Sequence, residues 1–325
     1  MKQLLVIALL VSIVLNSCGN MVSESSLKAS EIDAATIIKL INSGKPVALE
    51  GKTITGDIDF TCLKNQSSEN GKTIRMYIDQ PLSFVNCTFT GKIICSGFDN
   101  EKMYRRCTFA KNLIFTSCVF KEEVSFKESD VRGIADFSHS VFEKKADFSS
   151  IYFDCNNSYF NETSFNGDVL FNDSRFAGNV SFFKSFFKAT TLFQNIWFTG
   201  NVNFASVICN AYTDFSNACF MGMVNMNYLK SSAKLLLNSA RFMGRFDCMQ
   251  VNIEGLWEMK NSIFFGQTRL TEATCKGKVH FENISFYYLN NDFTKMKKAT
   301  DTEVFIQNIS PESTKIIFEE TSENN

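Results

Sequence analysis

The stretch VLFNDSRFAGNVSFFKSFFKATTLFQNIWFTGNVNF, residues 169–204, places phenylalanines alternately five and six residues apart. A side chain every five to six residues drifts around a helix of 3.6 residues per turn and forms no apolar stripe, so an amphipathic helix is excluded. The spacing instead indicates a repeat of short extended segments. The rings that set this rhythm are Phe171, Phe176, Phe182, Phe187, Phe193, Phe198 and Phe204.

The repeat is eleven residues long and extends far beyond this stretch. Seventeen blocks cover residues 102–289 with one extra residue, Asn157, and a further block at 82–92 fits after an irregular patch. The third position of the seventeen blocks is Phe in 11 and the eighth is Phe in 12, while the tenth is Gly in nine. The 34 Phe of the chain, beside 3 Pro, therefore reflect one repeated structural role.

Within each block the first and third positions, and the sixth and eighth, lie two residues apart. Residues with this spacing point to the same side of a strand, and the polar residues and glycines between the pairs permit the chain to turn. We therefore predict an all-β parallel solenoid with Phe in its interior and about 22 residues, two blocks, per coil. Coils stacked ~4.8 Å apart give roughly nine coils and ~45 Å of length over the repeat.

The segments ADFSH (135–139), ADFSS (146–150) and TDFSN (213–217) resemble the units of the pentapeptide-repeat family, with a small residue two places before a central Leu or Phe. The resemblance covers about residues 82–289 and implies a right-handed, four-sided parallel β-helix. This chain departs from the family pattern in its alternation of five and six, in its preference for Phe over Leu, and at Ser231, where Phe belongs. The interior is accordingly expected to be wider than in the standard form.

The N-terminus predicts export and lipid anchoring. Lys2 precedes an apolar run from Leu4 to Leu15, which has the length of a signal-peptide core, and the run ends in Leu-Asn-Ser-Cys at 15–18. This ending resembles a bacterial lipobox, which implies cleavage before Cys18 and lipid attachment to it. Several acyl chains anchor a protein stably, so we predict a lipid-anchored protein of a bacterial cell envelope, at the outer membrane.

The domain organisation follows from these segments. We predict a signal peptide at 1–17, a flexible tether at 18–29, an N-terminal cap of one helix and leading strands at 30–60, solenoid repeats at 61–289, and a C-terminal cap with a frayed tail at 290–325. The cap helix is predicted at 30–43, with Ser30 as its N-cap and Gly44 ending it.

The cysteines are predicted to be mostly free and buried. No CxxC or CxxH spacing exists among the 11, so a zinc cluster is not expected. Within the repeat only Cys155 and Cys219 take outward positions, and disulfides between neighbouring coils remain an alternative. Those assigned to interior positions are Cys87, Cys95, Cys107, Cys118, Cys209, Cys248 and Cys275.

The sequence offers no catalytic constellation. His139 and His280 fall in different coils, and Asp57 and Asp59 are interpreted as solvated flanks of Ile58. We expect no catalysis, no cofactor and no metal, and a formal charge of −1 predicts no nucleic-acid partner.

Outward aromatic and aliphatic residues break the rhythm and are the candidate binding residues. Stacking in two-block coils predicts that Phe186 lies between Ser164 and Ile208, with Trp197 on the opposite side between Arg175 and Cys219. Together with the anchor, they predict a binding or scaffold surface for an envelope protein or glycan. Two alternatives stay open, a carbohydrate-active β-helix enzyme and a DNA mimic that protects a topoisomerase, although the latter requires a cytosolic, strongly acidic protein. The candidates are Phe183, Phe186, Trp197, Ile208 and Tyr152.

Overall fold

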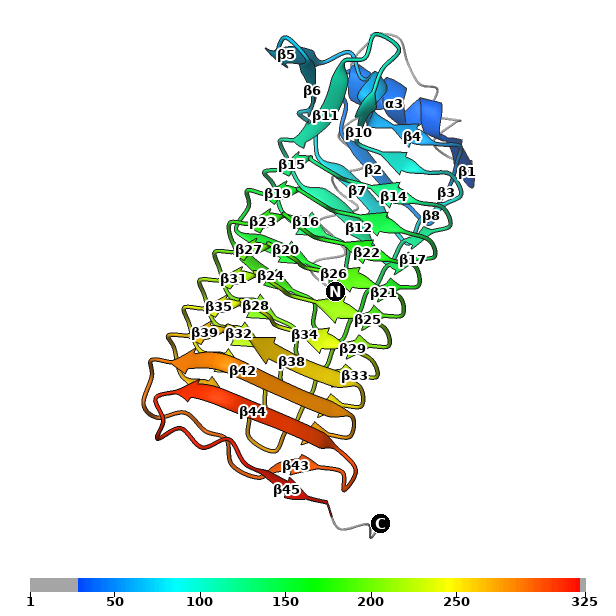
Figure 1. Cartoon of the computed structure of the whole chain (residues 1–325). Helices are drawn as coiled ribbons and strands as arrows, with labels where there is room; N and C mark the ends of the chain where they lie inside the picture. The colour runs from blue at the N-terminus through cyan, green and yellow to red at the C-terminus, as the bar shows by residue number, and fades with distance from the viewer. Residues whose placement is uncertain (1–28, 322–325) are drawn as a thin grey trace, which may run out of the picture.

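Within the part of the chain that the structure describes, residues 29–321, the fold is a long parallel β-solenoid with one short α-helix, α3 (Ala34–Asn42), at its N-terminal end (Figure 1). The structure is a computed structural model. Val180 pairs with Val202, which in turn pairs with Val224, so one coil takes 22 residues. The predicted fold class is confirmed. The predicted signal peptide, Cys18 and the tether up to residue 28 lie outside the described residues.

Each coil has four faces, defined here by the coil that runs from residue 179 to 198. Face 1 contains β24 (Asn179–Ser181), face 2 contains β25 (Phe186–Phe187), face 3 contains β26 (Thr191–Leu192) and face 4 contains β27 (Trp197–Phe198). Face 2 forms a 13-stranded sheet, which exceeds the nine coils expected from the repeat. The difference arises because segments before residue 82 and after residue 289 also stack on the repeat.

The other strands of face 1, in a 10-stranded sheet, are β2 (Val47–Glu50), β7 (Leu82–Val85), β12 (Leu113–Thr116), β16 (Ala135–Asp136), β20 (Asn157–Tyr159), β28 (Val202–Asn203), β32 (Val224–Asn225), β36 (Phe246–Asp247) and β40 (Thr268–Arg269). Those of face 2 are β1 (Glu31–Asp33), β3 (Thr53–Thr55), β8 (Thr88–Phe89), β13 (Val119–Phe120), β17 (Val141–Phe142), β21 (Ser164–Phe165), β29 (Ile208–Cys209), β33 (Lys230–Ser231), β37 (Asn252–Ile253), β41 (Thr274–Cys275), β43 (Met296–Lys298) and β45 (Phe318–Glu320).

Faces 3 and 4 form one 22-stranded sheet, because β42 (Lys278–Phe286) crosses the corner between them and pairs with strands of both. The others are β4 (Ile58–Asp59), β5 (Gln66–Asn70), β6 (Thr73–Ile78), β9 (Ile93–Ile94), β10 (Ser96–Phe98), β11 (Tyr104–Phe109), β14 (Val124–Ser125), β15 (Asp130–Val131), β18 (Ala146–Asp147), β19 (Tyr152–Phe153), β22 (Val169–Leu170), β23 (Arg175–Phe176), β30 (Thr213–Asp214), β31 (Cys219–Phe220), β34 (Leu235–Leu236), β35 (Arg241–Phe242), β38 (Leu256–Lys260), β39 (Ile263–Phe264) and β44 (Glu303–Ser310). A 3-10 turn, η1, covers Phe60–Cys62.

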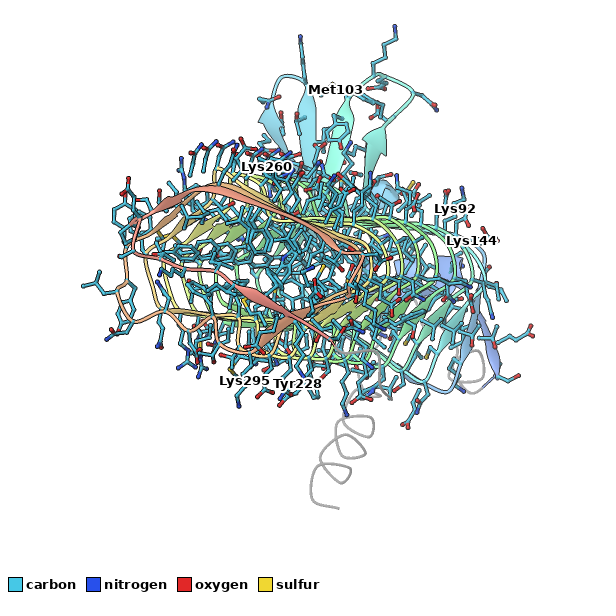
Figure 2. All side chains as sticks on the ribbon, turned by 60° about the horizontal axis from the view of Figure 1, so that its bottom comes forward. Lys92, Met103, Lys144, Tyr228, Lys260 and Lys295 are labelled. Atoms are coloured by element: carbon cyan, nitrogen blue, oxygen red, sulfur yellow. The ribbon has the colours of Figure 1, made fainter. Side chains whose placement is uncertain are left out.

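The phenylalanines of the repeat fill the interior, as predicted (Figure 2). Rings at the same position of successive coils stack in parallel, as Phe160, Phe182 and Phe204 do on face 1 with centroids 4.9 Å apart. Ladders of different faces meet edge to face, for example Phe182 and Phe193 at 5.6 Å and 80°. Each buried ring contributes about 1.5–3 kcal/mol by leaving water, before ordering costs, and these two geometries are the ones aromatic rings prefer.

Two of the four corners of each coil, one per block, are made by left-handed residues that are mostly not glycine. The fifth position of the block has a positive φ coil after coil, for example 57° at Lys184, 56° at Asn195 and 59° at Ser206. The sixth position turns back inward, and its small hydroxyls bond to a carbonyl of the preceding coil, as Ser174 Oγ does by donating to Phe148 O at 2.7 Å. The small sixth residue predicted from the sequence, where it is Ser or Thr, therefore also gives a hydrogen bond to a buried backbone carbonyl.

The glycines of the tenth position serve close stacking instead. A Cβ on Gly200 would lie 2.4 Å from Gly178 C, and one on Gly222 would lie 2.4 Å from Gly200 O. The sequence interpretation that these glycines permit the turn is therefore incomplete, because their φ is not left-handed and the backbones simply leave no room for a side chain.

Two hairpins interrupt the N-terminal coils. β5 pairs antiparallel with β6 and β10 with β11, while β6 and β11 pair in parallel. Figure 2 shows these arms projecting from the body, with Met103 at the tip of one. The irregular patch of the sequence is thus the β10–β11 hairpin.

The N-terminal helix begins at a different residue from the predicted one. Its N-cap is Asp33, whose carboxylate accepts a hydrogen bond from Ala35 N at 3.1 Å, and not Ser30. Residues 31–33 are instead β1, which pairs with β3 and extends face 2. At the C-terminal end β42, β44, β43 and β45 complete the stack, and β45 covers part of the strand expected around 316–318 (Figure 1).

Candidate functional site

The five candidate surface residues lie on three faces of the solenoid and do not form one site. Phe183 follows β24 on face 1, Phe186 and Ile208 lie on face 2, and Tyr152 and Trp197 lie on face 4. The register predicted from the sequence is the one observed, with Phe186 between Ser164 and Ile208 and with Trp197 between Arg175 and Cys219.

Face 4 carries a column of two aromatic rings around a guanidinium. Tyr152, Arg175 and Trp197 occupy one position of three consecutive coils. The Arg175 guanidinium lies over the Tyr152 ring at 5.4 Å, a cation–π contact. The Tyr152 hydroxyl donates to Asp154 at 3.2 Å, and burial, followed by the charge of Asp154, raises the pKa of Tyr152. Trp197 ends the column with 51% of its surface exposed.

Face 2 carries a smaller apolar pair. Phe186 is half-buried, and Ile208 in the next coil is exposed. On face 1 Phe183 is half-buried beneath the ammonium of Lys184, which lies 5.2 Å from the ring centre. All these residues stand on a rigid hydrogen-bonded scaffold, so their spacing is fixed by the coil.

Cys219 points outward as predicted but is buried, with 8% exposure. Its Sγ lies 3.7 Å from Met221 Sδ, and burial raises the pKa of its thiol. Cys155, the other outward cysteine, is half-buried. The ten cysteines among the described residues are all free.

An exposed apolar corner beside face 4 was not found from the sequence. The ninth position of alternate blocks carries exposed side chains in four successive coils, and Phe265 stacks on Tyr287 at 4.9 Å. The sequence signal that could have predicted this corner is the recurrence of a large apolar side chain every 22 residues. They are Met221, Met243, Phe265 and Tyr287.

A shallow groove of about 230 Å³ lies on face 1. None of its lining residues is an acid, a lysine, an arginine or a histidine, so it presents no acid–base pair. The sequence analysis missed this groove. The available signal was the recurrence of asparagine every 22 residues, at 157, 179 and 201 and again at 203 and 225. Its lining is Ser158, Tyr159, Asn179, Val180, Ser181, Asn201, Val202, Asn203, Met223 and Asn225.

The two histidines lie beside glutamates in different coils. His139 lies 3.7 Å from Glu162, and His280 lies 3.1 Å from Glu282 and 3.6 Å from Glu258. Within residues 29–321 no three His, Cys, Asp or Glu side chains are grouped so as to hold a metal ion. In the same range no helix is long and apolar enough to cross a membrane.

Comparison with known proteins identifies the repeat. Residues 104–151 match the family model described as pentapeptide repeats (9 copies). Comparisons with curated proteins and with solved structures gave no match. The matched segment lies inside the parallel solenoid, and the 22-residue coil continues after it, as the pairings of Val169 with Thr191, Thr191 with Thr213 and Thr213 with Leu235 on face 3 show. The chain is a pentapeptide-repeat protein with a solenoid fold.

Proposed function

We propose that this protein is a lipid-anchored envelope protein that uses the faces of its solenoid as a binding or scaffold surface, without catalysis. The observation that carries the binding role is the Tyr152–Arg175–Trp197 column, in which a half-exposed indole and a guanidinium are held in fixed register on one rigid face. Tryptophan, tyrosine and arginine are the residues most enriched at binding hot spots. The lipobox-like ending at Cys18 supports the anchor and the envelope address.

The anchor is tested by metabolic labelling with a tagged fatty acid followed by cell fractionation. The full chain is expected to take up label and to fractionate with membranes, and Cys18→Ser is expected to lose the label. An unlabelled, soluble cytosolic wild-type chain would overturn the proposed address.

The binding role is tested by pull-down from envelope extract with Trp197→Ser and with Phe186→Ser. Because these residues lie on opposite faces, the single variants assign any partner to a face. Tyr228→Ser is the matched control, since Tyr228 is 55% exposed at a corner where Ser206 of the preceding coil has the same left-handed backbone. If both single variants and the double variant capture the same proteins and glycans as wild type, the proposed surfaces are wrong.

A carbohydrate-active enzyme is the second candidate function, and the groove on face 1 is its structural support, although the residues that line the groove weigh against hydrolysis. No carboxylate lines that groove, whereas glycoside hydrolysis ordinarily uses a pair of them. Incubation of the full chain with neutral polysaccharides and measurement of reducing ends separates the two candidates, and we expect no release.

A further inference from the structure

Face 1 carries a block of twelve outward positions without a charged residue, eleven of them at least partly exposed and Ala205 buried, although one residue in five of the chain is charged (21%). Four consecutive coils contribute three outward positions each, and seven of the twelve are asparagines. We call this block the amide face. It consists of Asn157, Asn179, Asn201 and Met223 in the first column, Tyr159, Ser181, Asn203 and Asn225 in the second, and Asn161, Phe183, Ala205 and Asn227 in the third.

Charged residues lie at both ends of the amide face along the solenoid axis. Asp136 precedes Tyr159 in the second column, and Asp247 follows Asn225. Asp247 is paired with Arg245 at 2.9 Å and with Arg269 at 2.6 Å. The neutral window is therefore bounded along the solenoid axis, and the shallow groove lies within it.

The amide groups are oriented by the backbone. Asn179 Oδ1 accepts a hydrogen bond from Asn201 N, and Asn201 Oδ1 accepts one from Met223 N, each at 2.9 Å. In the second column Asn203 Oδ1 accepts from Ala205 N at 3.0 Å, and Asn225 Oδ1 accepts from Asn227 N at 3.0 Å. Because a backbone N–H requires an oxygen opposite it, the NH₂ end of each amide is fixed on the other side.

Two of these NH₂ groups are left to an outside partner. Among the described residues Asn203 Nδ2 reaches Ser181 Oγ at 3.4 Å, whereas Asn201 Nδ2 and Asn225 Nδ2 make no hydrogen bond. Glycines precede the first column at 178, 200 and 222, where a Cβ would meet the backbone of the preceding coil, so the coils stack closely beside the groove. In the first of the four coils the half-buried Tyr159 is part of the groove lining.

We propose that the amide face binds a neutral, extended oligosaccharide along the solenoid axis. Uncharged NH donors and hydroxyls suit sugar hydroxyls, and an aromatic ring offers an apolar surface to the face of a sugar ring. The two free donors, of Asn201 and Asn225, lie in successive coils, ~4.8 Å apart along the axis, and the amide face extends over roughly 14 Å for four coils, so it suits an extended chain aligned with the solenoid axis. No lysine or arginine lines the groove itself, which disfavours a phosphate or an acidic chain there. Two cations lie at the rim of the amide face, Lys184 over the Phe183 ring at 5.2 Å and Arg245, whose Nη2 lies 3.3 Å from Met223 Sδ.

This inference deepens the proposed binding role, but on a face that Trp197 and Phe186 do not share. Calorimetric titration of the detergent-solubilised full chain with neutral hexasaccharides of β-1,4-linked glucose, mannose and N-acetylglucosamine tests it, with hexagalacturonate as the charged control. At least one neutral chain is expected to bind, and hexagalacturonate is expected to bind at least tenfold more weakly. The proposal is overturned if none of the three binds, or if hexagalacturonate binds equally well.

The variant Asn201→Asp/Asn225→Asp assigns the site. Aspartate keeps the Oδ1 acceptor that the backbone needs but removes the outward NH donor, so the thermal melting curve is expected to stay that of wild type while affinity falls at least tenfold. Asn112→Asp is the matched control, because Asn112 Oδ1 accepts from Ile134 N at 3.0 Å on the same face but two coils before the amide face. Equal affinity of the double variant and wild type would refute the site, and Asn225→Asp alone replaces the double variant if that chain does not fold. If the wild-type chain binds none of the three neutral glycans while Trp197-dependent capture is intact, this inference is overturned and the proposed function still stands.

Discussion

Phe193 and Phe215 lie at the same position of consecutive coils, and their rings stack with centroids 4.6 Å apart and planes only 2° from parallel. Phe193 also stacks on Phe171 in the preceding coil at 5.2 Å. The ring is thus held between two others, and its place is set by the coil spacing and not by local sequence.

Replacing Phe193 by Ala is expected to destabilise the chain by about 3–5 kcal/mol, because it removes a fully buried ring and leaves a cavity between two coils that cannot approach each other. Chemical denaturation measures the change. Phe98→Ala is the control, since Phe98 is 75% exposed on a hairpin and its loss is expected to cost far less. Equal effects of the two substitutions would contradict an interior role for the ladder.

Gly222→Ala is expected to lower the free energy of unfolding by about 1–3 kcal/mol, because the added methyl would lie 2.4 Å from Gly200 O and would push two coils apart. Gly71→Ala, at a hairpin tip where an added Cβ meets nothing within 4 Å, is expected to leave stability unchanged. Thermal melting of both variants checks the pair. A neutral Gly222→Ala would mean that the coils are not stacked this closely.

The two tryptophans are expected to differ sharply in fluorescence. Trp257 is fully buried and meets Phe281 edge to face at 5.1 Å, whereas Trp197 is half-exposed. The variant Trp257→Phe, which retains only Trp197, should emit at longer wavelength and be quenched readily by acrylamide. Trp197→Phe should show the reverse, and similar quenching of both would place the indole of Trp197 elsewhere.

Acid is expected to loosen the projecting hairpins. A hydrogen bond from Arg106, with a second from Arg75, lowers the pKa of Glu69 from 4.5 to about 2 despite some burial. Since the folded pKa is depressed, these ion pairs stabilise the hairpin above pH 4.5, and the stabilisation is lost as the pH falls from 4.5 toward 2. Glu69→Gln should therefore lower the melting temperature at pH 6 and lower it much less at pH 2.5, where most of the stabilisation is already lost.

The control for this pH dependence is Glu101→Gln, on the turn of the neighbouring hairpin. Glu101 makes no ion pair within the part of the chain that the structure describes. Its replacement is expected to change melting little at either pH. An effect of Glu69→Gln that is the same at pH 6 and pH 2.5 would show that the ion pairs do not stabilise the hairpin.

The interior of the solenoid could be predicted from sequence because its signal is periodic and local. The inward positions of the block, the 22-residue coil and the neighbours of Phe186 and Trp197 follow from counting residues, since every coil repeats the same geometry. Three features could not be predicted in this way: the hairpins, the N-cap Asp33 and the burial of Cys219, whose Sγ lies against Met221. Each depends on a contact that the repeat does not contain.

The sequence by itself determined the repeat, the direction of each phenylalanine and the family, because burial of one face of a short strand imposes a period that can be counted. Only the tertiary structure decided which surface residues share a face. Tyr152 and Trp197 are separated by 45 positions yet lie in one column, while Phe183 and Phe186 are three apart and lie on different faces. The physical reason is that each corner turns the chain onto a new face within one block. The chain returns to the same face only after a full coil of 22 residues. For the same reason the asparagines of the amide face, which are far apart in sequence, lie side by side.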